Sequence, residues 1–231
     1  EGLRATSGTQ AVLTNDPSRA SPETHNVIAF GNVNNNDLLA RLYWSHCVFA
    51  DSLWPGVGEF ALRTVLDPYP WHGQGDVIVI GCSDQEGARR GVTELLERVN
   101  VDDKAMSYTV MVSNAPSVSA VEARDATLWT FKLAAESFLK TGRDVYLDQA
   151  LGALDGVAES YRERDPRTLA RFPITWPEEM NSDQLYAYWD ALEEHPRLTE
   201  AQRLRYTRMW LTVLRGLTTR VSDWAALTRP Q

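Results

Sequence analysis

The stretch Asp76-Val-Ile-Val-Ile80, followed at once by Gly81-Cys-Ser-Asp84, decides the fold of the first half of the chain. Its four consecutive β-branched residues make a run that is too short for a helix and rich in residues favoured in strands. Such a run predicts a central strand buried on both faces. Ser83 or Asp84 then caps a helix that runs to about Arg98.

Further strands and a second helix are predicted on either side of this stretch. The predicted segments are a strand at 25–30, a helix capped by Asn35 or Asn36 and stopped by Trp54-Pro55-Gly56, a strand at 59–66 and a last strand at 108–112. Residues 1–118 therefore read β-α-β-β-α-β. This order predicts an α+β fold class, with a small sheet domain that carries both helices on one face.

Residues 119–231 show helical periodicity and no strand pattern. Helices are predicted at about 126–140 and 144–161, from Ser182 or Asp183 to Pro196, and from the capping box Thr199-Glu-Ala-Gln202 onward. The break at Thr141-Gly142 predicts a helical hairpin. An all-α domain of helical hairpins is expected, which is either a small bundle or the beginning of a larger helical array such as a partial (α/α) toroid.

Composition excludes several classes of protein. The chain has 231 residues, 43% of them hydrophobic, with eight Trp, so a disordered chain is excluded, and two Cys exclude a disulfide framework. No apolar run approaches the roughly 18–20 residues that a membrane span requires. The net charge is −8 and Lys and Arg are not clustered, so a nucleic-acid partner is not expected.

The turn Gly81-Cys-Ser-Asp-Gln-Glu-Gly87 joins a strand to a helix, where α/β proteins often bind phosphate. It lacks a glycine-rich phosphate motif, and Asp84 and Glu86 would repel an anion there. We therefore expect a structural turn, with Gly87 and Gly91 allowing the helix to pack closely on the sheet.

Other residue types give little sign of chemistry. The four His are scattered singly, so no metal and no cofactor is predicted. Ser83 and Ser117 lack the G-x-S-x-G nucleophile motif. Cys47 and Cys82 are expected to be free, buried thiols rather than a disulfide.

The stretch from Phe172 to Asp190 is the most polar and aromatic part of the chain. Aromatic faces accept the C–H edges of sugars while carboxylates and amides bind their hydroxyls, so this stretch is the predicted substrate-binding surface. Its candidate residues are Trp176, Glu178, Glu179, Asn181, Asp183, Tyr186 and Tyr188.

Two chemistries are open for this surface, and no catalytic residue is assigned. Hydrolysis of a glycosidic bond needs two carboxylates about 5–10 Å apart, and Glu178, Glu179 or Asp183 is a candidate for one of them. Elimination needs a base near a neutralised uronate, for which Tyr186 and Asn181 are candidates. The alternative is structural, with Trp176 and Trp189 in the core and the carboxylates as helix caps.

The first half resembles a known accessory domain at Phe60–Pro68, Gly75–Gly81 and Gly91–Glu97. That domain precedes the catalytic part of glycoside hydrolases of the β-hexosaminidase and α-glucuronidase families, and it carries no catalytic residue. Leu133 to Tyr161, with the turn Thr141-Gly-Arg-Asp-Val-Tyr146, resembles one hairpin of an (α/α) toroid as in polysaccharide lyases. The chain departs from the accessory domain at Cys82, where Gly is usual, and it holds about two hairpins where a toroid needs about six.

The resemblance implies an extracytoplasmic enzyme, secreted or periplasmic, that degrades polysaccharide as a lyase or a glycoside hydrolase. This chain would be its N-terminal fragment without a complete active site, and its partners would be a polysaccharide or oligosaccharide and the remainder of its own longer chain. Two alternatives stay open. One is a non-catalytic module that binds carbohydrate or another partner, and the other is a purely structural pair of domains.

Overall fold

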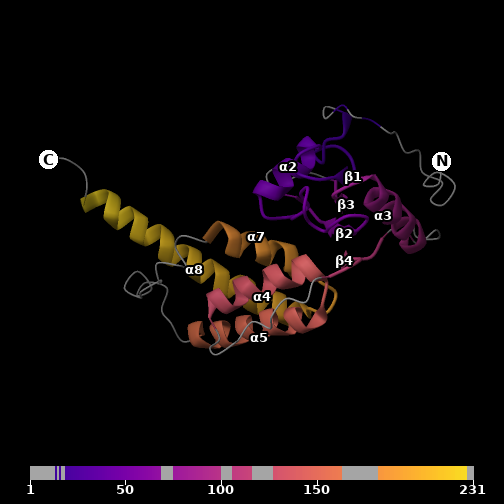
Figure 1. The fold of residues 1–231 in the computed structure, drawn as a ribbon. Helices are drawn as coiled ribbons and strands as arrows, with labels where there is room; N and C mark the ends of the chain where they lie inside the picture. The colour runs from indigo at the N-terminus through magenta and orange to yellow at the C-terminus, as the bar shows by residue number, and fades with distance from the viewer. Residues whose placement is uncertain are drawn as a thin grey trace. The chain divides into compact units, whose positions relative to one another are not determined.

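The computed structural model describes Thr14, Asp16 and residues 19–68, 75–99, 106–115, 127–162 and 182–227. The protein is a mixed α+β protein, as predicted, and it divides into two compact units (Figure 1). The sheet unit comprises Glu1–Val118 and Ser137–Arg143, and the helical unit comprises Ser119–Glu136 and Asp144–Gln231.

A four-stranded sheet forms the centre of the sheet unit. Its strands are β1 (Val27–Gly31), β2 (Phe60–Val65), β3 (Val77–Cys82) and β4 (Val110–Val112), in the spatial order β1-β3-β2-β4. β1 is parallel to β3, whereas β2 is antiparallel to both β3 and β4. β3 and β4 therefore run parallel with β2 between them, and β3 occupies the central position that its apolar sequence predicts.

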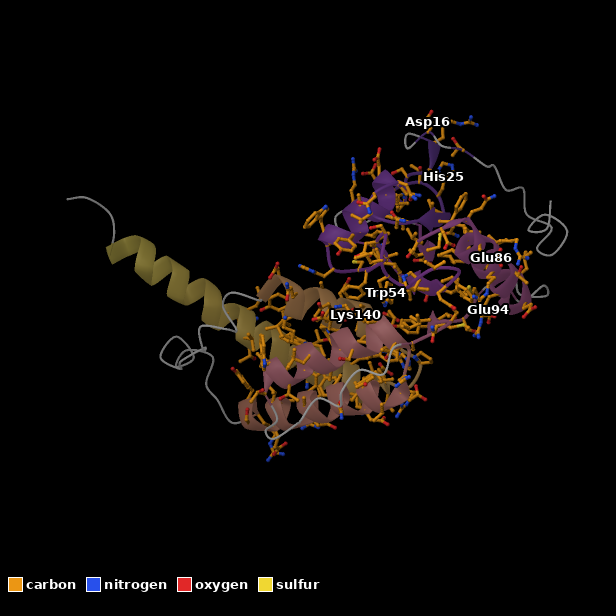
Figure 2. The ribbon with its side chains drawn as sticks, in the orientation of Figure 1. Asp16, His25, Trp54, Glu86, Glu94 and Lys140 are labelled. Atoms are coloured by element: carbon orange, nitrogen blue, oxygen red, sulfur yellow. The ribbon has the colours of Figure 1, made fainter. Side chains whose placement is uncertain are left out.

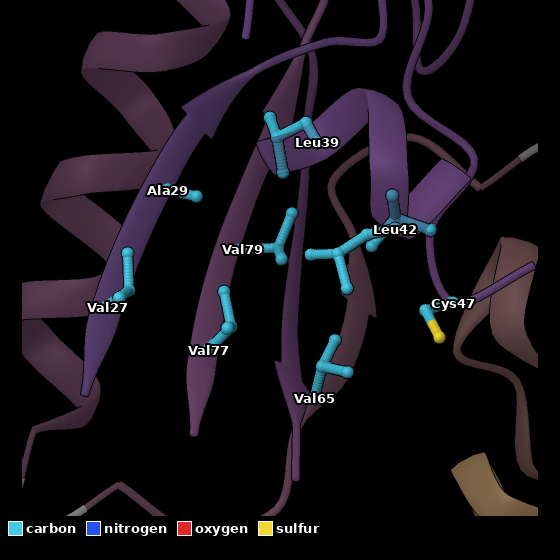
Figure 3. Close-up of a cluster of buried hydrophobic side chains, with 9 residues drawn as sticks. Val27, Ala29, Leu39, Leu42, Cys47, Val65, Val77 and Val79 are labelled. Carbon is cyan, nitrogen blue, oxygen red and sulfur yellow. The ribbon is translucent and has the colours of Figure 1, made fainter. Parts of the chain in front are cut away.

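The two helices of the sheet unit cover opposite faces of the sheet, so the prediction of both helices on one face is wrong. α2 (Asp37–Trp44) packs Leu39 and Leu42 against Val77 and Val79, as Figure 3 shows. α3 (Gln85–Arg98) packs Leu95 in a separate cluster with Phe60, Leu62 and Ile80. Neighbouring strand residues point to opposite faces, and β3 is apolar on both, so each face needs its own cover.

Both helices begin at residues that the sequence predicts, but the predicted end of the first helix is wrong. α2 ends at Trp44 and not at Trp54-Pro55-Gly56, because the backbone turns at His46, whose φ of +59° is incompatible with a continuing helix. The side chain of Asn36 accepts hydrogen bonds from the backbone N–H groups of Leu38 and Leu39, at 3.0 and 3.2 Å. Asp84 caps α3 by accepting from the N–H of Gly87 at 2.8 Å. Such caps satisfy backbone donors that a helix leaves open at its first turn.

Close packing of α3 on the sheet depends on its glycines, as predicted. A Cβ atom at Gly91 would lie 2.3 Å from Cγ2 of Ile80, and one at Gly87 would lie 2.2 Å from the carbonyl oxygen of Glu59. Neither position has room for a side chain, so the helix can approach the strands only where Gly occurs.

The helical unit is built from four helices in the described residues. They are α4 (Leu128–Thr141), whose last turn belongs to the sheet unit, α5 (Asp144–Tyr161), α7 (Ser182–Glu193) and α8 (Glu200–Leu227). Gly142 separates α4 from α5 with a φ of +67°, a conformation that favours glycine, so the predicted break is present. None of the described helices combines the length and apolar character of a membrane span.

Hydrogen bonds fix the start of α8 and its position against α5. The predicted capping box is formed, since Gln202 N donates to Thr199 Oγ1 at 3.2 Å and Thr199 N donates to Gln202 Oε1 at 3.0 Å. Arg205 reaches α5, with Nη1 2.8 Å from Asp155 Oδ1 and Nη2 3.4 Å from Glu159 Oε2.

Candidate functional site

Four of the seven predicted substrate-binding residues, Trp176, Glu178, Glu179 and Asn181, lie outside the described residues. The other three lie on α7. Asp183 is exposed in its first turn, Tyr186 is half-buried, and Tyr188 is buried in the helical core with 2% of its surface exposed. The structure therefore does not bring these three side chains together on one exposed surface.

Tyr186 belongs to an aromatic cluster formed with Trp210 of α8 and Phe131 of α4. The ring centroids of Tyr186 and Trp210 are 5.4 Å apart with an interplanar angle of 62°. Those of Phe131 and Trp210 are 5.7 Å apart at 59°. Three helices thus contribute to this Tyr186–Trp210 cluster, and edge-on aromatic contacts of this kind add to the stability gained from burial.

The cluster contains two hydrogen-bond donors that find no acceptor in the described part of the chain. The hydroxyl of Tyr186 and Nε1 of Trp210 are both shielded from solvent, and neither has a hydrogen-bond partner there. Buried polar atoms are paired in most proteins, and each unpaired one costs about 1–3 kcal/mol. Gln184 Oε1 and Gln149 Oε1 are also buried without a partner, so the helical unit holds both donors and acceptors of this kind.

The electrostatic setting of Tyr186 favours its protonated form. Burial, with a smaller contribution from Tyr161 at the end of α5, raises the pKa of Tyr186 to about 12. A phenol with its pKa raised in this way stays protonated at neutral pH, so it is a poor base and keeps a hydrogen that it can donate. The arrangement suits binding of an acceptor oxygen better than abstraction of a proton.

The turn after β3 is structural, as predicted. Asp84 Oδ2 accepts from the N–H of Gly58 at 2.8 Å, in addition to the bond that caps α3. The hydrogen bonds from Gly87 and Gly58 lower the pKa of Asp84, so the carboxylate is charged and occupies the place of an anion. Ser83 Oγ donates to the carbonyl of Asp51 at 3.1 Å, and these contacts hold the loop 51–58 against the start of α3.

Both cysteines are free and buried, as predicted. The pKa of the Cys82 thiol is raised, mainly by burial. The raised pKa disfavours the thiolate, which is the nucleophilic form of cysteine. Within the described ranges, no three His, Cys, Asp or Glu side chains are grouped so that they could hold a metal ion.

A small cavity lies in the sheet unit beside β2 and β3. Its volume is about 20 Å³, the room of about one water molecule, and its walls include Phe49, Trp54, Met111 and the buried Arg63. A cavity of this size cannot admit a sugar. Trp54, which Figure 2 labels, therefore helps to enclose a small internal cavity and does not line a sugar site there.

Trp210 and Phe131 were not among the residues predicted for the site. Their spacing in α8 and α4 is that of core residues, and both are indeed buried, with 4% and 0% of their surface exposed. A sequence shows no sign that one polar atom of a core residue lacks a partner. This feature becomes visible only when α4, α7 and α8 are packed together.

Comparison with known proteins adds no family assignment. No family model matches the chain, and neither the curated proteins nor the solved structures gave a significant match.

Proposed function

We propose that this chain is part of an extracytoplasmic enzyme that degrades polysaccharide, and that its helical unit binds the glycan at the Tyr186–Trp210 cluster. The observation that carries this proposal is the pair of buried donors, Tyr186 Oη and Trp210 Nε1, which find no acceptor among the residues that the structure describes. Hydroxyl, ether and carboxylate oxygens of a sugar are suitable acceptors, and the aromatic rings beside the donors suit its C–H edges.

The half-buried position of Tyr186 makes access of a glycan feasible. Part of this residue reaches the surface while its hydroxyl is shielded, so the proposal requires a change of side-chain rotamer that presents the hydroxyl to a ligand. A hydrogen bond from the Tyr186 hydroxyl to the glycan would offset the free energy that the unpaired donor costs in the unbound protein. This gain would add to the affinity that comes from burying the sugar against the aromatic rings.

A non-catalytic glycan-binding module is the second candidate. It is favoured by the raised pKa of Tyr186, since a phenol that stays protonated binds an oxygen but does not act as the base of an elimination. The two functions differ in turnover. An enzyme releases new reducing ends or unsaturated products from a polysaccharide, whereas a module binds the chain and leaves it intact.

The test is glycan-array binding of the 231-residue chain, followed by calorimetric titration with neutral and acidic oligosaccharides. We expect Tyr186→Phe to weaken binding about tenfold with no loss of thermal stability, because only an unpaired hydroxyl is removed. Tyr43→Phe in the sheet unit is the matched control and is expected to bind as the wild type does. Absence of binding to every glycan, or equal binding by Tyr186→Phe, would overturn the assignment of the site.

A further inference from the structure

α8 carries apolar residues on two sides. One side is buried and carries Tyr206, Met209, Trp210 and Val213, each with 4% or less of its surface exposed. The other side exposes Leu204, Leu211 and Leu214, with 50%, 49% and 42% of their surface accessible. We call these three residues the leucine stripe.

The spacing of the leucine stripe is regular. Leu211 follows Leu204 by seven residues and Leu214 follows Leu211 by three, so all three lie along one side of the helix. Scattered exposed apolar residues are normal, but an aligned row marks an interaction surface. A helix that is apolar on both sides is usually covered on both.

Charge next to the leucine stripe suggests what covers it. Arg208 is exposed and lies four residues after Leu204 and three before Leu211, which places its guanidinium along the stripe. The preceding helix of the same hairpin is acidic on its exposed side, where Asp183, Asp190 and Glu194 recur at intervals of seven and four. The pair of helices α7 and α8 therefore carries both an acidic row and an apolar stripe with one arginine, Arg208, beside it.

α8 already uses arginine in this way inside the helical unit. Arg205 binds Asp155 and Glu159, two carboxylates that lie four residues apart on α5. The interval between Asp190 and Glu194 is the same, so the acidic row of α7 offers Arg208 a set of carboxylates like the one that Arg205 binds.

We propose that the leucine stripe is covered by a second copy of this chain, with Arg208 facing Asp190 and Glu194 on α7 of the other copy. A two-fold axis between two α7–α8 hairpins makes this contact twice, since the same patch serves on both sides of a symmetric interface. Stable interfaces bury about 800 Å² on each partner, and three half-exposed leucines supply only part of that, so the dimer is weak.

The experiment is sedimentation velocity of the 231-residue chain over a concentration series that reaches on the order of 1 mM, where weak dimers with a Kd of tens to hundreds of micromolar are populated. The wild type is expected to dimerise, and added salt is expected to weaken the dimer because an ion pair contributes. Leu211→Ser is expected to raise the Kd at least about fivefold. Val145→Ser is the matched control, since Val145 on α5 is similarly exposed, at 53%, and lies outside the stripe.

A charge reversal with its rescue tests the pairing itself. Arg208→Glu is expected to weaken dimerisation, and the double variant Arg208→Glu with Glu194→Arg is expected to restore it. Circular dichroism of each variant shows that the fold is kept. A chain that stays monomeric at every concentration would overturn the proposal, and so would a dimer that Leu211→Ser and Arg208→Glu leave unchanged.

Discussion

The phenolic hydroxyl of Tyr206 donates a hydrogen bond of 2.8 Å to Oδ1 of Asp155, joining the buried side of α8 to α5. Tyr206 has 0% of its surface exposed. Burial, and then the hydrogen bond to Asp155, raises the pKa of the Tyr206 phenol. Tyr206 thus has the hydrogen-bond acceptor that the buried hydroxyl of Tyr186 does not find among the described side chains and backbone.

We expect Tyr206→Phe to lower the free energy of unfolding by about 1–2 kcal/mol, because a hydrogen bond to a carboxylate is lost while the ring stays packed. Urea unfolding followed by circular dichroism measures this change. An unaltered midpoint would show that the bond to Asp155 contributes nothing to stability.

Tyr186→Phe is expected to behave in the opposite way, with a stability equal to the wild type or higher by up to about 1 kcal/mol. Removing an unpaired buried hydroxyl removes a desolvation cost and no hydrogen bond. The same urea titration serves as the measurement. A loss greater than about 1 kcal/mol would mean that the hydroxyl has a partner in solution.

Gly91→Ala is expected to destabilise the sheet unit by about 1–3 kcal/mol, because the new methyl group overlaps Cγ2 of Ile80 and forces α3 away from the sheet. Gly152→Ala on α5 is the matched control. No atom lies within 4 Å of a Cβ at Gly152, so there the better helix former is expected to stabilise by about 0.4–1 kcal/mol. Thermal unfolding of both variants separates steric overlap from helix propensity.

The helical unit is expected to lose stability as the pH falls through the ordinary range of histidine, about 6.5. Burial, helped by Arg197 and opposed by Asp144, lowers the pKa of His195. The unfolded chain then binds the proton more readily than the folded one, so stability rises with pH across this window. Unfolding free energies measured between about pH 5 and 7.5 give the slope, with His195→Gln as the variant that cannot titrate.

A shallower slope in His195→Gln confirms the contribution of this residue, and an identical slope contradicts it. The comparison is needed because Glu193 acts in the opposite direction. Burial, and then Asp190 and Glu194, raises the pKa of Glu193, so its contribution is present at low pH and is lost as the pH rises through that raised pKa. The difference between variant and wild type isolates His195.

Local patterns in the sequence predicted the elements of the fold and where the capped helices begin, but not where α2 ends. Asn36, Asp84 and Thr199 begin helices, and Gly142 separates two, because capping and left-handed turns depend on residues that are neighbours in the chain. The opposite placement of α2 and α3 was missed, although the unbroken apolar run of β3 already required cover on both faces.

The predicted site residues on α7 do not share one environment. Spacing and composition singled out Tyr186, but they also singled out Tyr188, which lies in the core two residues away on another side of α7. When both sides of a helix carry aromatic residues, the spacing of residues in the sequence does not show which of two tyrosines packs against the other helices.

By itself, the sequence determined the order of the elements, the helix caps, the close approach of α3 through Gly91 and the acidic composition, because each depends on local chain geometry or on residue counts. Tertiary structure alone decided which sheet face each helix covers, which polar atoms are buried without partners, and which leucines of α8 stay exposed. These features depend on packing between elements distant in sequence, where a hydrogen bond or a buried surface is made by two segments together.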